Sequence, residues 1–347
     1  MKNITSLVLC VIVALTCLIS GGIYSSAEEA TNDNYKYVVM DDGTVELTEY
    51  SGNETVINIP SKIDGKNVTK VDNEVLVRSN ITEINLPDTV YKNIDDILFY
   101  RDPELKAINV SEKNKYISSV DGVLFNKDKT VLYSFPRQKE DKEYTIPNGV
   151  KTIGQHAFCH AKNIEKVTLS SSVREIGAYA FEDSGLKEIK LNNKLKTIRK
   201  GAFSLARLAE IYIPKSVKKM GNRMFGESNR YIKIYGFKNS AAQKIAKKYN
   251  YKFYIVDPAA PKKTTVRGAK GKITVNYKKV KKAKGFQVKA VSGKKKVVKT
   301  YKTEKSAKKS LKGMKKGTYK VKVRAFNTYN GEKIYGPWAK AKTVTVK

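Results

Sequence analysis

The chain has 347 residues and a formal net charge of +34, from 67 basic and 33 acidic residues. That length allows two domains, each with a core of its own. Its two histidines, His156 and His160, restrict histidine-based catalysis to one short segment.

The first 27 residues are typical of a cleaved secretory signal. A basic start at Lys2 precedes an almost wholly apolar run, Ile4–Ser20, and Ser25–Ala27 has the small residues that signal peptidase requires. The alternative is an uncleaved membrane anchor, because the apolar run approaches a spanning length. We expect cleavage, which leaves Cys159 as the one cysteine, no intramolecular disulfide and no transmembrane segment.

Internal repetition is the strongest pattern in the sequence. A unit close to Ile-Pro-x-x-Val-x-x-Ile-Gly-x-x-Ala-Phe begins at Ile146 and recurs up to Phe225. The phenylalanines of the four units are 23, 22 and 22 residues apart. A fixed period of this length predicts a solenoid. Each unit has a short alternating strand, such as residues 166–169, and must stack on its neighbours to bury its apolar side.

These units resemble leucine-rich repeats of the BspA-like type. Upstream, residues 55–60, 82–87 and 105–110 match strands of earlier units with irregular spacing, and residues 120–136 resemble a hairpin insertion common in that family. Residues 239–249 have apolar positions at helical spacing after the N-cap candidate Ser240, which predicts a C-terminal cap. We assign residues 28–257 to this solenoid domain.

The composition changes after a short linker at 257–261. Residues 258–347 contain 29 basic and two acidic residues, whereas residues 28–257 contain 37 basic and 31 acidic residues. Short runs that alternate apolar residues with lysine predict a β-sandwich. The seven runs are 264–267, 272–277, 285–291, 296–301, 306–311, 319–326 and 341–346.

This second domain resembles a fibronectin type III domain of Gram-positive extracellular proteins. The matching stretches are 273–277, 283–288, 311–325 and 335–338, and Tyr277 stands where such domains place a core tryptophan. The predicted fold class is therefore mainly β, with a leucine-rich-repeat solenoid followed by a fibronectin type III-like β-sandwich.

One set of candidate ligand-binding residues consists of outward strand positions of the solenoid. Because strand side chains alternate, these positions should form one row on a sheet that offers an extended binding surface. The alternative is a solvated polar strip. The residues are Asn85, Asn109, Thr145, Thr168, Lys190 and Tyr212.

A second set consists of the lysine runs of the C-terminal domain. A field of this strength favours polyanions, with affinity that falls steeply with salt. The alternative is a charged surface that only maintains solubility. The polyanion-binding candidates are Lys278, Lys279, Lys281, Lys282, Lys294, Lys295, Lys296, Lys308 and Lys309.

No catalytic residue, metal or cofactor is predicted. His156, Cys159 and His160 could ligate zinc, but the sister units place other residues at these positions and a fourth ligand is not evident. No nucleophile or phosphate-loop motif is present. We therefore expect a protein that is not an enzyme.

The resulting hypothesis is a secreted or surface-associated bacterial binding protein of the adhesin type, from a Gram-positive cell. The solenoid would bind an extracellular protein or glycan, and the basic domain would contact anionic cell-wall polymers. Export excludes genomic nucleic acid as the partner. One alternative is a structural spacer of the envelope. A further alternative is a glycan-processing enzyme, but the sequence lacks the carboxylate architecture that such chemistry needs.

Overall fold

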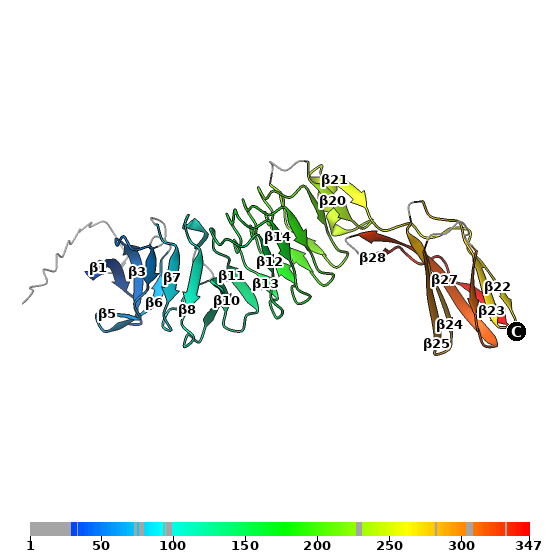
Figure 1. The fold of residues 1–347 in the computed structure, drawn as a ribbon, viewed down its shortest axis with the longest axis horizontal. Coiled ribbons are helices and arrows are strands. Elements are labelled where there is room, and N and C mark those ends of the chain that lie inside the picture. The colour runs from blue at the N-terminus through cyan, green and yellow to red at the C-terminus, as the bar shows by residue number, and fades with distance from the viewer. Residues whose placement is uncertain are drawn as a thin grey trace, which may run out of the picture.

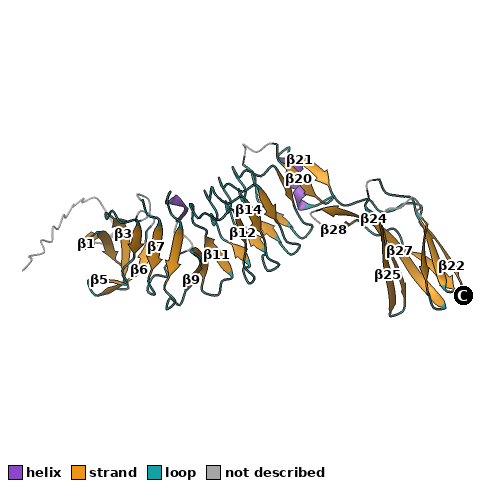
Figure 2. Ribbon diagram, in the orientation of Figure 1, coloured by secondary structure: helices purple, strands orange, loops and turns teal. Residues whose placement is uncertain are grey.

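The computed structural model describes residues 29–347 except 33, 73, 74, 76–79, 93, 95–98, 227–230, 282, 303–307, 330 and 331, so the predicted signal peptide lies outside the described residues. Within this part the protein is mainly β, and α1 (Ala241–Lys248) is its one α-helix (Figure 2). None of the described helices is long and apolar enough to cross a bilayer. The mainly β prediction is confirmed.

The repeats form a solenoid in which each coil contributes strands to parallel ladders (Figure 1). The first strands of the coils lie in three short parallel sheets. These are β4 (Val56–Asn58), β7 (Glu83–Leu86) and β8 (Ala107–Val110); β12 (Glu143–Thr145), β14 (Lys166–Thr168) and β16 (Glu188–Lys190); and β18 (Glu210–Tyr212), β20 (Lys233–Gly236) and β21 (Lys252–Ile255).

The second strands of the coils form another ladder, in which consecutive coils pair in parallel. It consists of β11 (Val131–Ser134), β13 (Thr152–Ile153), β15 (Glu175–Ile176), β17 (Thr197–Ile198) and β19 (Lys219–Met220). The glycine after such a strand permits close stacking, because a Cβ on Gly177 would lie 2.6 Å from the carbonyl group of Gly154. This spacing explains the Ile-Gly pair of the repeat.

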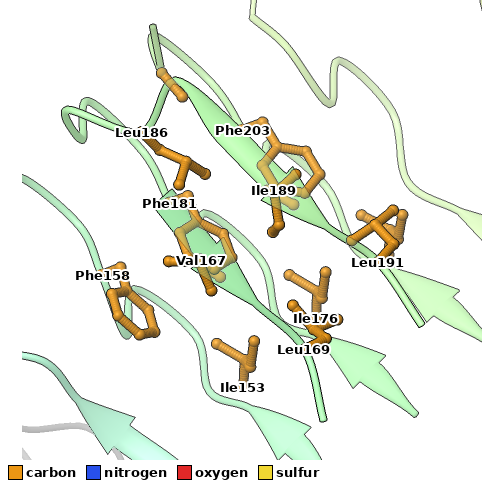
Figure 3. Close-up of a cluster of buried hydrophobic side chains, with 14 of the residues drawn as sticks. Ile153, Phe158, Val167, Leu169, Ile176, Phe181, Leu186, Ile189, Leu191 and Phe203 are labelled. Carbon is orange, nitrogen blue, oxygen red and sulfur yellow. The ribbon is translucent and has the colours of Figure 1, made fainter. Parts of the chain in front are cut away.

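A column of phenylalanine rings fills the interior of the coils (Figure 3). Phe158 stacks on Phe181 with ring centroids 4.8 Å apart, and Phe181 stacks on Phe203 at 5.6 Å. The column extends to Phe135 at one end and Phe225 at the other. One phenylalanine per coil, each touching the next, makes the core continuous between repeats.

The predicted hairpin at 120–136 is present as β10 (Val123–Asn126) and β11, which pair antiparallel. Strand β10 also forms an antiparallel hairpin with β9 (Ile117–Val120), and this hairpin divides the solenoid core in two. Strand β10 is buried on both faces: Val123 and Phe125 belong to the C-terminal core cluster, whereas Leu124 belongs to the N-terminal one. The hairpin thus stands between the earlier coils and the regular ones.

The N-terminal end of the solenoid is covered by a sheet that the repeat pattern did not predict. Its strands are β1 (Glu29–Asn32), β2 (Tyr35–Val39), β3 (Val45–Tyr50), β6 (Lys66–Val71) and β5 (Lys62–Ile63), in that spatial order. A 3₁₀ turn, η2 (Phe99–Arg101), lies within the early coils.

The helix predicted within residues 239–249 is present. Helix α1 begins after Ser240, whose hydroxyl accepts a hydrogen bond from the backbone N–H of Gln243. Ala242 and Ala246 are buried against the last coils, which closes the apolar interior from solvent.

Two antiparallel sheets that share one core follow the solenoid. One sheet contains β22 (Thr265–Ala269), β23 (Lys272–Asn276) and β26 (Lys308–Lys312); the other contains β25 (Lys295–Lys302), β24 (Gly285–Ser292), β27 (Gly317–Tyr329), β28 (Glu332–Tyr335) and β29 (Lys342–Val346). Ile273 and Leu311 of the first sheet pack with Val288 and Val323 of the second. Each of the seven predicted runs overlaps an observed strand, and β28 is an additional one.

Candidate functional site on the outward face of the solenoid

The outward face is produced by the alternation of the first strands. The central residue of most of these strands is buried, as Ile84, Val167 and Ile211 are, and its neighbours point away from the core; Tyr144 and Phe253 are half-buried at this position. The parallel register then places equivalent outward residues of successive coils side by side. In each first strand, one outward residue directly follows the central residue, and we call these residues together the outward column.

The structure places all six predicted residues in the outward column, but not in one unbroken row. Asn85 and Asn109 lie in the first sheet, Thr145, Thr168 and Lys190 in the second, and Tyr212 in the third. The prediction of a single row on one sheet is wrong, because the hairpin β9–β10 lies against β8 and separates it from β12.

Three amides form a ladder at the N-terminal end of the outward column. The Nδ2 of Asn85 donates to Oδ1 of Asn58 at 2.9 Å, and the Nδ2 of Asn109 donates to Oδ1 of Asn85 at 3.0 Å. The ladder borders a shallow groove of about 360 Å³. Nδ2 of Asn109 also donates to Oε1 of Glu83 at 2.6 Å, which uses its second donor hydrogen. Each amide oxygen has two lone pairs, so the rungs keep acceptor capacity for a polar ligand.

The central part of the outward column is polar and open to solvent. Thr145 pairs in register with Thr168, and Thr168 with Lys190. Thr145 and Lys190 are exposed, and Thr168 is half-buried. On the same strands a parallel row alternates in charge, with Lys166 Nζ 3.1 Å from Glu143 Oε2. This stretch offers hydroxyl and charged groups without apolar cover.

Tyrosines occupy the C-terminal end of the outward column, and part of the C-terminal domain covers them. Tyr212 and Tyr235 are adjacent in register, and the ring of Tyr329, from β27, lies 4.8 and 5.2 Å from their respective ring centroids. Burial, and then the carboxylate of Glu210, raise the pKa of Tyr329 to about 12. Tyr212 is therefore partly covered from within the chain.

The contact around Tyr329 joins the two domains across the predicted boundary at 257/258. Phe237 and Val256 of the solenoid end are buried together with Ile334 of β28. The Nδ2 of Asn327 also donates a hydrogen bond of 3.2 Å to the carbonyl of Val256. The two domains thus meet through an apolar cluster as well as through the linker.

Removal of the Tyr329 ring should loosen this contact. Each aromatic pair contributes about 0.5–1.5 kcal/mol beyond area burial, so Tyr329→Ala should raise the population of separated domains roughly tenfold. Limited trypsin cleavage next to the linker, at Lys262 and Lys263, measures this population. Tyr116→Ala, at a distant exposed tyrosine, is the control and should leave the rate unchanged. An equal rate in Tyr329→Ala and wild type would contradict the docking.

The lysines of the C-terminal domain lie in two separated groups. Lys278, Lys279 and Lys281 follow β23 and lie near β26, whose Lys308 pairs in register with Asn276 at the end of β23. Lys294, Lys295 and Lys296 lie at the opposite end of β24, beyond Ser292. Strand β24 has 8 residues, which separates the groups by roughly 23 Å at about 3.3 Å per residue.

This separation favours an extended polymer over a compact ligand, because a single small anion cannot reach both groups.

Lys309 of the first group lies over the ring of Tyr301, with Nζ 5.3 Å from the ring centroid. The predicted site residue Lys282 lies outside the described residues.

Sequence reasoning missed three members of the outward column. Asn58 extends the amide ladder, and Tyr235 and Tyr254 continue the tyrosine stretch in register with Tyr212. The same strand pattern, applied to the coils before and after the clear repeats, would have found them, because each directly follows the central apolar residue of its strand.

The comparisons with known proteins agree with the solenoid. The family model described as the BspA type leucine-rich repeat region matches residues 33–123 and 131–252, in 6 copies. No curated protein matches the chain.

Several solved structures are similar to the chain at low identity. A leucine-rich cell surface protein from Faecalibacterium prausnitzii is 18% identical, covers 61% of this chain and 89% of its own, and has a TM-score of 0.37. The pneumococcal vaccine antigen PcpA is 18% identical, with 66% and 98% covered and a TM-score of 0.42. The family model matches more than half of the chain, and the protein belongs to the BspA type leucine-rich repeat family.

Proposed function

We propose that this protein is a secreted or surface-associated bacterial binding protein of the adhesin type. The solenoid binds an extracellular protein or glycan through the outward column, and the lysines of the C-terminal domain contact anionic envelope polymers. The single observation that carries the proposal is the outward column itself, in which amides, hydroxyls and charges are aligned in register within each sheet of a repeat scaffold. Repeat scaffolds of this kind present extended binding surfaces.

We infer further that the C-terminal domain is a fibronectin type III-like sandwich. The support is its strand order, β22-β23-β26 in one sheet and β25-β24-β27 with β29 in the other, around a shared core. The predicted signal peptide supports export from the cell, and the lysine-rich sheets support a Gram-positive envelope rich in anionic polymers.

Two substitutions that add negative charge in the central part of the outward column test whether the solenoid binds a ligand there. The double variant Thr168→Glu/Lys190→Glu changes two adjacent rungs without touching a buried residue. Full-length protein is applied to arrays of extracellular proteins and glycans at high salt, which suppresses diffuse binding by the lysines. We expect at least a tenfold loss of affinity, about 1.4 kcal/mol, for the ligand that the wild type captures.

A matched control places the same change elsewhere on the solenoid. Lys196→Glu/Thr197→Glu alters a lysine and a threonine at the second-strand ladder, where β17 lies. This control should bind like the wild type. Equal losses in both double variants, or none in either, would remove the outward column as the binding site and favour the envelope-spacer alternative.

A further inference from the structure

The residues that bind transition metals best are concentrated at one place in this chain. Both histidines, His156 and His160, and the cysteine that remains beyond residue 17, Cys159, lie within five residues of each other. They occupy the turn that follows the Ile-Gly corner of one coil. No acidic ligand for this cluster is evident from the sequence alone.

The next coil supplies an acidic partner. Backbone hydrogen bonds from Phe158 N to the carbonyl of Ala180 and from His160 N to the carbonyl of Glu182 align the two turns. This register sets Glu182 beside Cys159. The donor atoms of His156, Cys159 and Glu182 all lie within 4.8 Å of one another.

The imidazole of His156 is positioned by its neighbours. Its ring stacks on the ring of Tyr179 with a centroid distance of 5.3 Å and an interplanar angle of 8°. The Nδ1 atom is buried and lies 4.0 Å from Oε2 of Glu182. The turn itself is tight, because His156 and His160 both have positive φ. The nitrogen is thus turned toward the carboxylate instead of toward solvent.

The cysteine of this group is buried, and the histidine and the glutamate are half-buried. Cys159 is only 1% exposed, and burial, followed by the charges of Glu182 and Asp183, raises the pKa of its thiol to about 12. Burial also raises the pKa of Glu182 and lowers the pKa of His156. A dication among these donors would stabilise the thiolate and the carboxylate, and a neutral imidazole is the form that binds metal.

The second histidine is engaged differently. Nδ1 of His160 lies 2.8 Å from Oδ2 of Asp183, whose other oxygen lies 2.6 Å from Lys162 Nζ. Asp183 is therefore held by His160 and by the cationic side chain of Lys162 at the margin of the cluster. The coils that follow lack the donor set, since Gly201 and Ser204 occupy the positions of His156 and Cys159.

We propose that His156, Cys159 and Glu182 form a binding site for a divalent transition-metal ion of the zinc class, which joins two adjacent coils of the solenoid. One nitrogen, one sulfur and one oxygen ligand suit Zn²⁺, with water in the remaining tetrahedral position. On binding, the thiol releases its proton to solvent and the sulfur coordinates as the thiolate. Because the ligands come from two coils, the ion would stabilise their stacking.

Cobalt substitution tests this site directly on the full chain. Co²⁺ bound by a thiolate gives a near-ultraviolet charge-transfer band, and its titration with Zn²⁺ reports the relative affinity. Two conservative variants remove ligands separately: Cys159→Ser, which installs the residue found at the equivalent Ser204, and Glu182→Gln. His160→Gln is the control. Cys10 and Cys17 are present in every sample, so they do not account for a difference between samples.

The wild type and His160→Gln should both bind a single ion and give the band. Cys159→Ser should lose the band, and Glu182→Gln should keep it with at least roughly tenfold weaker affinity, since loss of even an outer partner costs 10–100-fold. Zn²⁺ should also raise the melting temperature of the wild type but not of Cys159→Ser. A wild-type chain that is folded by circular dichroism yet shows neither a band nor a zinc-dependent melting shift would overturn the proposal.

Discussion

Replacing Phe181 with alanine should lower the free energy of unfolding by about 3–5 kcal/mol, the usual cost of removing a buried phenylalanine ring. Phe181 is fully buried and stacks on Phe158 on one side and Phe203 on the other. The change removes contacts to two coils at once, so the cavity interrupts the core between repeats. In a solenoid this interface energy supplies much of the stability.

Urea denaturation followed by circular dichroism measures the effect. Tyr231→Ala removes another aromatic ring from a coil turn, but Tyr231 is 81% exposed, so we expect a change within about 0.5 kcal/mol. A loss below about 1 kcal/mol in Phe181→Ala would show that the phenylalanine column does not hold the coils together.

Binding of the full chain to a soluble anionic polymer should weaken by roughly 10³-fold between 50 and 200 mM salt, if about six lysines contact the polymer. The charge asymmetry is the reason, since residues 258–347 have 29 basic and two acidic residues. Replacing Lys294, Lys295 and Lys296 with glutamine should reduce the slope of log affinity against log salt by about 2–3.

Fluorescence anisotropy of a labelled polymer across a salt series gives this slope. The control replaces three exposed lysines of the solenoid, Lys194, Lys218 and Lys247, with glutamine. If the control lowers the slope as much as the C-terminal variant does, the polymer binds by net charge alone and the C-terminal lysines have no special role.

The parts of the fold that could be predicted from the sequence are those that follow from local patterns of residues. The 22–23-residue period predicted the coils, because the same strand, corner and phenylalanine recur in each. Ser240 before an apolar helical pattern predicted α1 to within a residue or two. In the C-terminal domain, alternation of apolar residues with lysine predicted the strands, because each sheet has one face on the core.

The contacts that escaped prediction join residues far apart in sequence. Tyr212 is an outward residue by strand alternation, yet the ring of Tyr329, more than 100 residues later, covers it. No local pattern encodes that contact, because it depends on how the second domain docks. The N-terminal sheet was missed for another reason: its first three strands lie before residue 55, where the first recognised repeat strand begins, and they pair antiparallel.

The position of Glu182 could be predicted in part. It lies 23 residues after Cys159, one repeat period, so the period places it beside the cysteine once the coils are known to be in register. The six residues predicted for ligand binding were placed correctly in the outward column for the same reason. The break between the first and second of their three sheets required knowledge of the hairpin β9–β10.

Lysine footprinting on purified cell envelopes tests most directly whether the two domains have different partners. The full chain is acetylated free and envelope-bound, and the reactivity of each lysine is measured by mass spectrometry. We expect protection of Lys278, Lys279, Lys281, Lys294, Lys295 and Lys296, with Lys190 of the outward column equally reactive in both states. Unchanged reactivity of the C-terminal lysines in the bound state, or protection of Lys190 alone, would contradict the proposed division of roles.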